Sequence, residues 1–519
     1  MHERASGTLT VGSFLRTAAL RFPEREAFYC ASTDRRFTFR ETNARANRLA
    51  NALLGLGLKK GDCVAFLSSN RAEVVEIYFA LAKTGLVGMP LNYRLAPVEV
   101  VALMKEVGAV ALLFEAPYAD TAAVVREELP AVREQVAFGA PDAADDLPAH
   151  AYESLLATAP DAEPQADVNE GDPYYFNLTS GTTGMPKCYV INHYNNATIF
   201  NMFHVFEMSR DDVVLTVFPM YGRVGFAWIA ASIMYGCRNV ISNFQPQQTL
   251  ELMARERVTI VNLVATMAAM LLQRPELDDT DLRSLRATVF AGSLLPASIR
   301  DAVTARICKG LYEYYGMQET GALVASTPED RARRPDSVGQ PILFAEIRIV
   351  GFDGGALPAG ESGVILGRSP GGVMAYYNNP EKTAETFRDG WINTGDVGYV
   401  DEEGYLFISG RTKDVIVTGG QNVHAGEVEA AILDCPGVAA CAVIGLPDDF
   451  WGERVTAIVV PTPGQPLQAD DIMAWCRKSL AGFKAPKQVV FQDDPLPQTP
   501  TGKIRKFVLV ERYRDTPVA

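Results

Sequence analysis

A loop rich in glycine and hydroxyl side chains, closed by a lysine, is the segment of this chain best suited to chemistry. It reads NLTSGTTGMPK at residues 177–187 and follows the apolar run YYFNL at residues 174–178. Gly181 and Gly184 allow the backbone to turn sharply and to present its N–H groups to an anion. Further donors come from Thr179, Ser180, Thr182, Thr183 and Lys187. The loop therefore predicts a polyphosphate site.

The spacing of this loop differs from that of the ordinary P-loop, in which the lysine directly follows the second glycine and precedes Ser or Thr. Here Met185 and Pro186 separate Gly184 from Lys187, and Cys188 follows the lysine. Pro186 also opposes a continuous helix through the lysine. A flexible Ser/Thr/Gly linker is the alternative, but the apolar run before the loop and its Pro-Lys end argue against it.

A second motif, YGMQET at residues 315–320, combines an aromatic ring, a glycine and a carboxylate. The ring of Tyr315 could lie flat on a nucleotide base, and the segment AGS precedes it at residues 291–293. A carboxylate such as Glu319 can hold a magnesium ion that bridges phosphates. Taken alone, the motif is more simply a turn that contains a glutamate.

A third motif, GWINTGDVGYVDEEGYLFISGRTKD, occupies residues 390–414. Asp396 lies in a tight Thr-Gly-Asp turn, where its carboxylate could accept two hydrogen bonds from a ribose diol. Arg411 could meet a ribose oxygen or a phosphate. The alternative is a pair of hairpins with Asp396 in an Asx-turn, which fits equally well in isolation.

Two further motifs follow near the C-terminus, TGGQNVHAGEVE at residues 418–429 and PQTPTGKIRK at residues 497–506. The paired glycines Gly419 and Gly420 permit close approach of the backbone to a ligand. Lys503 directly follows a glycine on a loop rich in Pro and Thr, and it offers one positive charge. Taken alone, a solvated basic tail is the simpler explanation for Lys503.

These motifs are carried by alternating strands and helices. Residues 61–94 predict a strand, a helix that ends at Gly85 and a second strand. Further apolar runs, separated by helical stretches, lie at residues 213–218, 240–242, 259–264 and 287–291. This alternation predicts an α/β fold of stacked, largely parallel sheets with helices on both faces. Beyond about residue 338, dense glycines and short alternating runs predict a β-rich subdomain, and residues 413–519 predict a small α+β domain.

Length and composition place the chain among large globular proteins. Its 519 residues exceed what one hydrophobic core holds, and 48% of them are apolar and 21% charged. The net charge of −14 argues against bulk nucleic-acid binding, which needs a basic face. The eight cysteines show no CxxC spacing, which predicts reduced thiols in a cytoplasmic protein. The apolar segments at residues 213–235 and 258–272 are interrupted or too short to span a bilayer.

The five motifs, taken together and in this order, resemble the adenylate-forming superfamily of acyl-CoA synthetases, firefly luciferase and peptide-synthetase adenylation domains. The resemblance runs from about Thr10 to Lys506 and rests on TSGTTGMPK, YGMQE, NTGD, GRTKD and PTGK. It implies a large N-terminal domain at residues 1–412 that binds ATP and an acid, with its β-rich subdomain at about residues 338–412. It also implies a small mobile domain at residues 413–519 that rotates about a hinge at Lys413.

The resemblance also assigns a role to each motif. Residues 179–187 would hold the pyrophosphate end of ATP, with Thr179 and Lys187 taking part in catalysis, and Glu319 would hold Mg²⁺. Lys503 would bridge the acid carboxylate and the α-phosphate. Adenine would stack on Tyr315, and Asp396 and Arg411 would bind the ribose. Outside the phosphate loop, Glu319 and Lys503, the residues implied to bind ATP are Ala291, Gly292, Ser293, Tyr315, Gly316, Gln318, Asp396 and Arg411.

This chain departs from the family's pattern at several positions. Cys188 and Ala425 replace a common glycine and proline, and Gln318 stands where a threonine commonly contacts phosphate; its amide can still donate, with a different reach. The segment FPMYGRVG at residues 218–225 lines the acid pocket in relatives, and Gly222 makes room there in place of a common histidine. For Arg223 an outward, solvated side chain is the favoured interpretation. The alternative is contact with a second carboxylate or polar group on the substrate.

The sequence therefore predicts an ATP-dependent carboxylic acid–CoA ligase, acting through an acyl-adenylate on a small to medium aliphatic or aromatic acid. The predicted acid pocket consists of Tyr221, Gly222, Arg223, Gly225, Ala265, Ala291, Gly316, Met317 and Gly321. The predicted coenzyme A contacts are Gly419, Gly420, Trp451, Phe483 and Lys484. A free-standing adenylation enzyme that loads a carrier protein, and a non-catalytic nucleotide-binding relative, are the alternatives. The acid, the final acceptor and the assembly state, a homodimer included, stay open.

Overall fold

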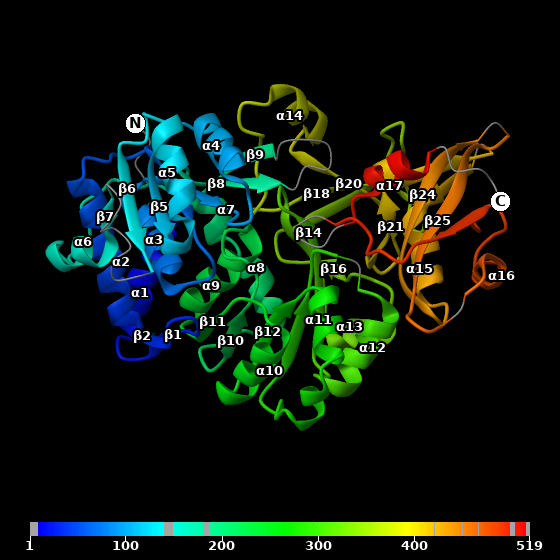
Figure 1. Cartoon of the computed structure of the whole chain (residues 1–519), viewed down its shortest axis with the longest axis horizontal. Helices are drawn as coiled ribbons and strands as arrows, with labels where there is room; N and C mark the ends of the chain where they lie inside the picture. The colour runs from blue at the N-terminus through cyan, green and yellow to red at the C-terminus, as the bar shows by residue number, and fades with distance from the viewer. Residues whose placement is uncertain are drawn as a thin grey trace.

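The computed structural model describes residues 9–139, 149–179, 187–293, 295–419, 421–448, 450–465, 467–498 and 504–514, without the side chains of Thr179 and Asn422. Within these residues the chain forms four β-sheets and the helices that pack against them. Figure 1 shows the N-terminal elements on one side of the molecule and the C-terminal sheet, in orange and red, on the other.

The large sheet is parallel from β1 to β14, and its hairpin partners β2, β15 and β16 are antiparallel. The strands predicted at residues 213–218, 240–242, 259–264 and 287–291 form its interior, which confirms this part of the prediction. In sheet order the strands are β16 (Gln340–Pro341), β15 (Gly321–Ser326), β14 (Leu311–Met317), β13 (Ala287–Phe290), β12 (Ile260–Leu263), β10 (Val213–Thr216), β11 (Arg238–Ile241), β1 (Glu26–Cys30) and β2 (Arg35–Thr38).

The second sheet has the same parallel character, with an antiparallel pair at one edge. The strand, helix and strand predicted within residues 61–94 are confirmed as β3, α3 and β4. In sheet order its strands are β7 (His150–Ala151), β6 (Glu134–Phe138), β5 (Ala109–Glu115), β3 (Cys63–Leu67), β4 (Val87–Leu91), β8 (Pro173–Thr179) and β9 (Lys187–Asn192).

Two buried helices fill the layer between these sheets. Every residue of α3 (Ala72–Thr84) is buried, and α9 (Arg223–Tyr235) is buried over most of its length. The rings of Tyr78 and Phe226 stack across the two helices with centroids 3.8 Å apart. Gly85 ends α3 with φ at +73°, a conformation that favours glycine, as the sequence predicts. A helix that is buried on every side fits only such an interior layer.

Helices also cover the outer faces of both sheets. In β3, Val64 and Phe66 join the core shared with α3, whereas Cys63, Ala65 and Leu67 join the core beneath α4 (Pro97–Glu106) and α5 (Ala119–Glu128). This period of two is what a strand covered on both faces requires. Helices α10 (Pro246–Arg255), α11 (Ala265–Leu272) and α12 (Ala297–Arg306) cover the large sheet in the same way. The predicted α/β fold class is therefore confirmed.

Two smaller sheets follow in the chain. The first is antiparallel and consists of β17 (Glu346–Val350), β18 (Gly363–Arg368), β20 (Trp391–Val400), β19 (Phe387–Arg388) and β21 (Leu406–Arg411). The C-terminal sheet consists of β23 (Gln421–His424), β22 (Val415–Thr418), β25 (Gly452–Pro461), β24 (Val438–Asp448) and β26 (Gln488–Phe491). The 3₁₀ turn η4 (Thr412–Asp414) connects them and contains Lys413.

The C-terminal sheet carries α15 (Ala425–Leu433), α16 (Ala469–Ser479) and α17 (Lys506–Tyr513). Figure 1 shows β20 and β21 between the large sheet and this C-terminal unit. The remaining helices are α1 (Gly12–Arg21), α2 (Phe39–Gly55), α6 (Tyr152–Thr158), α7 (His193–Ala197), α8 (Phe200–Phe203), α13 (Pro328–Arg333) and α14 (Pro380–Thr386). No helix within the described ranges is both long and apolar enough to cross a membrane.

Candidate functional site

The carboxyl ends of neighbouring parallel strands gather most of the predicted site at one edge of the large sheet. In an open parallel sheet, ligands bind at this edge because the loops that leave the strands meet there. The four strands concerned, β10, β12, β13 and β14, follow one another across the sheet. The segment Tyr221–Gly225 comes after β10, Ala265 after β12 and the segment Ala291–Ser293 after β13. Strand β14 itself ends in Tyr315, Gly316 and Met317. Residues from four distant parts of the sequence therefore share one edge.

Glycines 316 and 321 shape the turn that carries Tyr315 and Glu319. A Cβ atom on Gly316 would lie 2.0 Å from the main-chain oxygen of Gly321, so no other residue fits there without movement. Gly321 has φ at +67°, in the left-handed region that favours glycine. Both glycines thus hold the turn tightly against β15.

Tyr315, Asp396 and Arg411 form a polar cluster at one end of this turn. The Tyr315 hydroxyl donates to Asp396 Oδ2 at 2.7 Å, and Arg411 Nε lies 3.2 Å from Asp396 Oδ1. Asp396 and Arg411 face each other across the antiparallel pair β20–β21. Burial raises the pKa of Tyr315 well above its usual value, so the hydroxyl stays protonated. The sequence motifs of Tyr315 and Asp396 thus meet in space, and Arg411 neutralises the aspartate.

A second polar cluster lies at the other end of the turn and joins Glu319 to Lys187. The carboxylate of Glu319 is buried, and its Oε1 accepts a hydrogen bond of 2.5 Å from the hydroxyl of Tyr376. The Lys187 ammonium lies 4.8 Å from the centre of the Tyr376 ring, at cation–π distance. Tyr376 was not among the predicted site residues, because a tyrosine in the stretch MAYYNNP carries no motif of its own.

The setting of Glu319 suits a nucleotide-bound Mg²⁺ ion. Among the described residues, no lysine, arginine or histidine forms an ion pair with this buried carboxylate. The same residues contain no group of three or more His, Cys, Asp or Glu side chains that could hold a metal. Mg²⁺ in nucleotide sites is typically held by one or two carboxylates together with phosphates and water. A single buried, unneutralised carboxylate therefore fits a metal ion that arrives with ATP.

Several predicted residues lie outside what the structure describes. These are residues 180–186 of the phosphate loop, Gly420 and Lys503, together with the side chain of Thr179. The flanks of the phosphate loop are described, since Thr179 ends β8 and pairs with Lys187 at the start of β9. The loop therefore begins and ends at one point of the second sheet, beside Tyr376.

The segment around Tyr221 borders the predicted acid pocket. The Tyr221 ring packs edge-on against Tyr93 with centroids 5.7 Å apart, and its hydroxyl is buried without a hydrogen-bond partner among the described residues. Burial raises the pKa of Tyr221 to about 12, so this hydroxyl is a protonated donor. Gly225 is required for packing rather than for space in the pocket, because a Cβ there would lie 2.3 Å from the carbonyl oxygen of Pro219.

The favoured prediction for Arg223, a solvated outward side chain, is wrong. Arg223 is only 7% exposed, and its guanidinium donates to the main-chain oxygens of Gln318 and Gly371. The charge-assisted hydrogen bonds to both carbonyl oxygens offset the cost of burying this charged side chain. Arg223 thereby ties the start of α9 to the turn that carries Glu319.

The predicted coenzyme A contacts fall into two groups on the C-terminal unit. Gly419 has φ at +57°, donates its N–H to the Trp451 main-chain oxygen at 2.7 Å, and lies so close to the indole that a Cβ would be 3.0 Å from it. Lys484 is ion-paired to Glu427 at 2.6 Å, and Phe483 is partly exposed beside it. Trp451 and Phe483 thus present aromatic surface to solvent, while the charge of Lys484 already has a partner.

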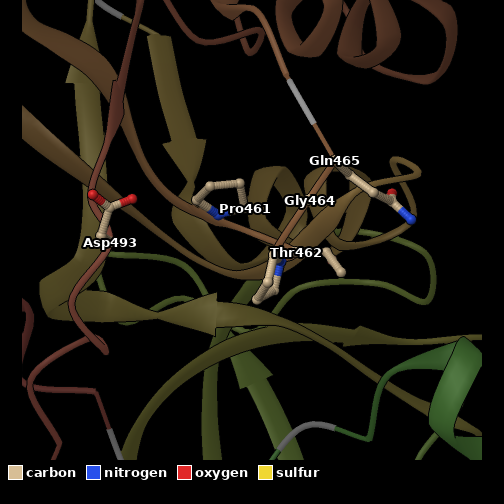
Figure 2. A pocket seen from close by; sticks show the side chains of 6 residues that line it. Pro461, Thr462, Gly464, Gln465 and Asp493 are labelled. Atoms are coloured by element: carbon tan, nitrogen blue, oxygen red, sulfur yellow. The ribbon is translucent and has the colours of Figure 1, made fainter.

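A hollow of 530 Å³ on the C-terminal unit does not coincide with any of these groups. It is lined by the turn at residues 461–465 and by Asp493, which Figure 2 shows on the other side of the hollow. It contains none of the predicted site residues and only one charged group. The candidate site is therefore placed at the sheet edge described above, where the polar clusters lie.

Comparison with known proteins agrees with the family that the sequence motifs resemble. A model of the AMP-binding enzyme family matches residues 15–377, and a model of the AMP-binding enzyme C-terminal domain matches residues 427–503. The long-chain-fatty-acid–CoA ligase FadD13 of Mycobacterium tuberculosis is 33% identical over 508 residues, which cover 98% of this chain and 99% of that protein. Feruloyl-CoA synthase of Amycolatopsis is 36% identical over 487 residues, covering 92% and 94%.

A solved structure extends the likeness to three dimensions. ATP-bound MatB from Rhodopseudomonas palustris has a TM-score of 0.88 and 30% identity to this chain, and covers 98% of this chain and 99% of that one. Because the family match, the full-length relatives and the fold agree, the chain belongs to the AMP-binding enzyme family, in its acyl-CoA synthetase branch.

Proposed function

We propose that this protein is an ATP-dependent carboxylic acid–CoA ligase that forms an acyl-adenylate and releases AMP and pyrophosphate. The observation that carries the proposal is the pair of polar clusters on one turn. Tyr315 binds Asp396 at one end, and Glu319 binds Tyr376 beside Lys187 at the other. This arrangement suits a ribose at the first cluster and phosphates at the second.

In the first half-reaction the acid carboxylate attacks the α-phosphorus of ATP, and the bond to pyrophosphate breaks. Two negative groups must approach each other, so positive charge has to be supplied. Lys187 would bind the departing pyrophosphate and Lys503 would lie between the carboxylate and the α-phosphate. Mg²⁺, held by Glu319, would withdraw charge from the phosphates when it is bound. The buried Tyr376 hydroxyl fixes one oxygen of Glu319 and leaves the other for the metal.

In the second half-reaction the thiol of coenzyme A attacks the acyl carbon, its proton is lost, and AMP leaves. Lys503 and the pantetheine arm would need the same approach to the acyl group, so the two half-reactions require different positions of the C-terminal unit. The turn η4, which contains Lys413, lies between the two sheets that would move relative to each other. Partial desolvation lowers the pKa of Lys413, whose side chain is exposed in this turn.

The acid is proposed to be a small to medium aliphatic or aromatic monocarboxylic acid. Arg223 supports the restriction to one carboxylate, because its guanidinium already binds two carbonyl oxygens. FadD13 is named for long-chain fatty acids and the Amycolatopsis enzyme for ferulate.

The test is pyrophosphate release over a panel of aliphatic and aromatic acids, each with coenzyme A or with a phosphopantetheinylated carrier protein as acceptor. Acid-dependent pyrophosphate release and coenzyme A-dependent thioester formation are expected. Transfer to the carrier protein alone would identify a carrier-loading enzyme instead. Absence of pyrophosphate exchange with every acid would identify a non-catalytic nucleotide-binding protein.

We also propose a cytoplasmic location. All eight cysteines are buried and unpaired. The thiol of coenzyme A and the free cysteines both stay reduced in a reducing compartment. The test is to purify the protein from its natural cell without added reductant, denature it and count its free thiols. All eight cysteines should be found reduced.

A further inference from the structure

The segment at residues 373–377 connects the flank of the phosphate loop to the turn that carries Glu319. At one end, the Val373 N–H donates to the main-chain oxygen of Glu319 at 2.8 Å. At the other end, the Tyr377 N–H donates to the main-chain oxygen of Cys188 on β9 at 2.7 Å. Because β9 belongs to the second sheet and the turn follows β14 of the large sheet, this segment bridges the two sheets.

Within this segment, Tyr376 is held from three elements. It is 6% exposed, and its main chain forms an antiparallel bridge with Tyr189 of β9. Its N–H donates to Thr383 Oγ1 of α14 at 3.0 Å, and its ring packs edge-on against Phe387 of β19 with centroids 5.4 Å apart. The position of the Tyr376 ring is therefore set by the fold.

The hydroxyl and the ring face of Tyr376 contact groups of opposite charge. The hydroxyl donates to Glu319 Oε1 at 2.5 Å, a length typical of an O–H bond to a carboxylate. The Lys187 ammonium lies 4.8 Å from the centre of the ring. Burial and the Glu319 carboxylate raise the pKa of Tyr376 well above its usual value, so the hydroxyl keeps the proton that it donates. One side chain thus contacts both charged groups.

An exposed carboxylate on α14 is the alternative contact for Lys187. The pKa of Glu385 is lowered first by its hydrogen bond from Lys382, at 2.6 Å, and to a smaller extent by the nearby charge of Lys187. Glu385 is exposed, and attraction between charges in water fixes a side chain only weakly. The buried ring of Tyr376 is the better-fixed contact of the Lys187 ammonium.

We propose that Tyr376 is a positioning residue for both the metal and the phosphates of the nucleotide, its hydroxyl orienting Glu319 and its ring face holding Lys187. The inference rests on the proposed function, because it takes Glu319 as the group that would hold Mg²⁺ and Lys187 as the one that would bind pyrophosphate. It adds to that function two separable effects of one side chain, which different substitutions remove.

The test measures the binding of ATP to the full chain by calorimetry, once with excess Mg²⁺ and once with EDTA. The ratio of the two affinities is the gain that the metal provides. Tyr376→Phe removes the hydroxyl and keeps the ring. A hydrogen bond to a charged group is worth about a tenfold change in affinity or more, so the gain from Mg²⁺ should fall about tenfold. The affinity for ATP in EDTA should stay within about twofold of the wild-type value.

Tyr376→Leu removes the ring as well as the hydroxyl. The gain from Mg²⁺ should fall as in Tyr376→Phe, and the affinity for ATP in EDTA should also fall, by about fivefold, because Lys187 loses its cation–π contact.

Two further measurements keep the inference testable if the leucine variant does not fold. In a Glu319→Gln background, Tyr376→Phe should cause no further loss of the gain from Mg²⁺, since the hydroxyl acts through Glu319. Thioester formation from supplied acyl-adenylate should not change in Tyr376→Phe, because that half-reaction involves no pyrophosphate.

Tyr377 provides the matched control. It is the next residue of the same segment, and its ring packs edge-on against Phe176 with centroids 5.0 Å apart, in the core beneath α4 and α5. Tyr376 joins the core between the two sheets instead, so the two side chains point in opposite directions. Tyr377→Phe and Tyr377→Leu should leave both ATP affinities unchanged.

Several results would overturn the inference. These are an unchanged gain from Mg²⁺ in Tyr376→Phe, a further loss in the Glu319→Gln background, slower thioester formation in Tyr376→Phe, or the same losses at Tyr377. An unchanged affinity for ATP in EDTA in Tyr376→Leu would overturn the role of the ring. In each case the wild-type protein would still bind ATP and release pyrophosphate, so the proposed function would stand. A wild-type protein that neither binds ATP nor releases pyrophosphate with any acid would overturn both.

Discussion

Replacement of Asn70 by alanine should weaken the contact between the two large sheets and destabilise the protein. Asn70 follows β3 of the second sheet and is 1% exposed. Its Nδ2 donates to the main-chain oxygens of Phe218 at 2.8 Å and Ser242 at 2.9 Å, and its Oδ1 accepts from the Met220 N–H at 2.8 Å. All three partners follow strands of the large sheet. One side chain therefore joins the sheets and holds the segment that leads to Tyr221.

The magnitude follows from the groups that the substitution would leave unpaired. Each buried polar group without a partner costs about 1–3 kcal/mol. Asn70→Ala leaves three, so we expect a loss of roughly 3–6 kcal/mol, allowing for partial relaxation. Asn262→Ala is the matched control, because Asn262 is also nearly fully buried but makes a single side-chain bond, to the Val289 main-chain oxygen at 2.8 Å. That variant should lose about 1–2 kcal/mol.

The assay combines calorimetry with kinetics. The midpoint of thermal unfolding should fall several degrees further for Asn70→Ala than for Asn262→Ala. The KM for the acid should rise more than the KM for ATP, because Met220 adjoins the predicted acid pocket and not the nucleotide clusters. Equal midpoints for the two variants would refute the reasoning about the shared bonds. Equal rises in both KM values would refute the assignment of this segment to the acid.

Three further predictions concern the nucleotide site, the second half-reaction and pH. Asp396→Ala should raise the KM for ATP about tenfold and change that for 2′-deoxyATP less, because the lost bonds go to the ribose; steady-state kinetics with both nucleotides checks this. Lys503→Ala should lower pyrophosphate release by about 100-fold or more yet spare thioester formation from supplied acyl-adenylate, and equal losses would contradict the two-position account. Burial lowers the pKa of His193 to about 4, so the unfolded chain takes up a proton first as pH falls below about 6.5. Stability from His193 is thus present above that pH and lost towards pH 4, by about 2 kcal/mol between pH 7.5 and 5, and unfolding scans should show a shallower pH dependence for His193→Phe.

The elements that carry the site could be predicted because their signals are local. The helical spacing of α3 and the left-handed glycine that ends it, Gly85, lie within a short stretch of chain. The short apolar runs of β10, β12 and β13 likewise mark buried parallel strands. Once those strands are adjacent, the meeting of their carboxyl ends follows from topology alone. The family resemblance implied that Tyr315 lies near the residues after β13, and the strand topology supplies the physical reason.

The contacts that hold the site could not be predicted, because they use the main chain or residues without a motif. Arg223 binds two carbonyl oxygens, and every residue of the chain has such an oxygen, so nothing in the sequence distinguishes Gln318 and Gly371 as its partners. A charged residue beside a pocket is more often solvated, and that expectation failed here because α9 lies between two sheets. Tyr376 was missed for a related reason, since a buried tyrosine that belongs to no motif reads as core.

The position of Arg411 links nucleotide binding to the predicted hinge. Arg411 is paired with Asp396, which Tyr315 also binds. Arg411 is also the residue directly before η4, the turn that contains Lys413. The last residue before the turn is therefore held by the large N-terminal unit through an ion pair and a strand pair. A ribose bound at Asp396 would add bonds to the same cluster. If the C-terminal unit rotates as proposed, we expect the rotation to begin after Arg411 rather than within β21, with the change in backbone angles taken up in η4.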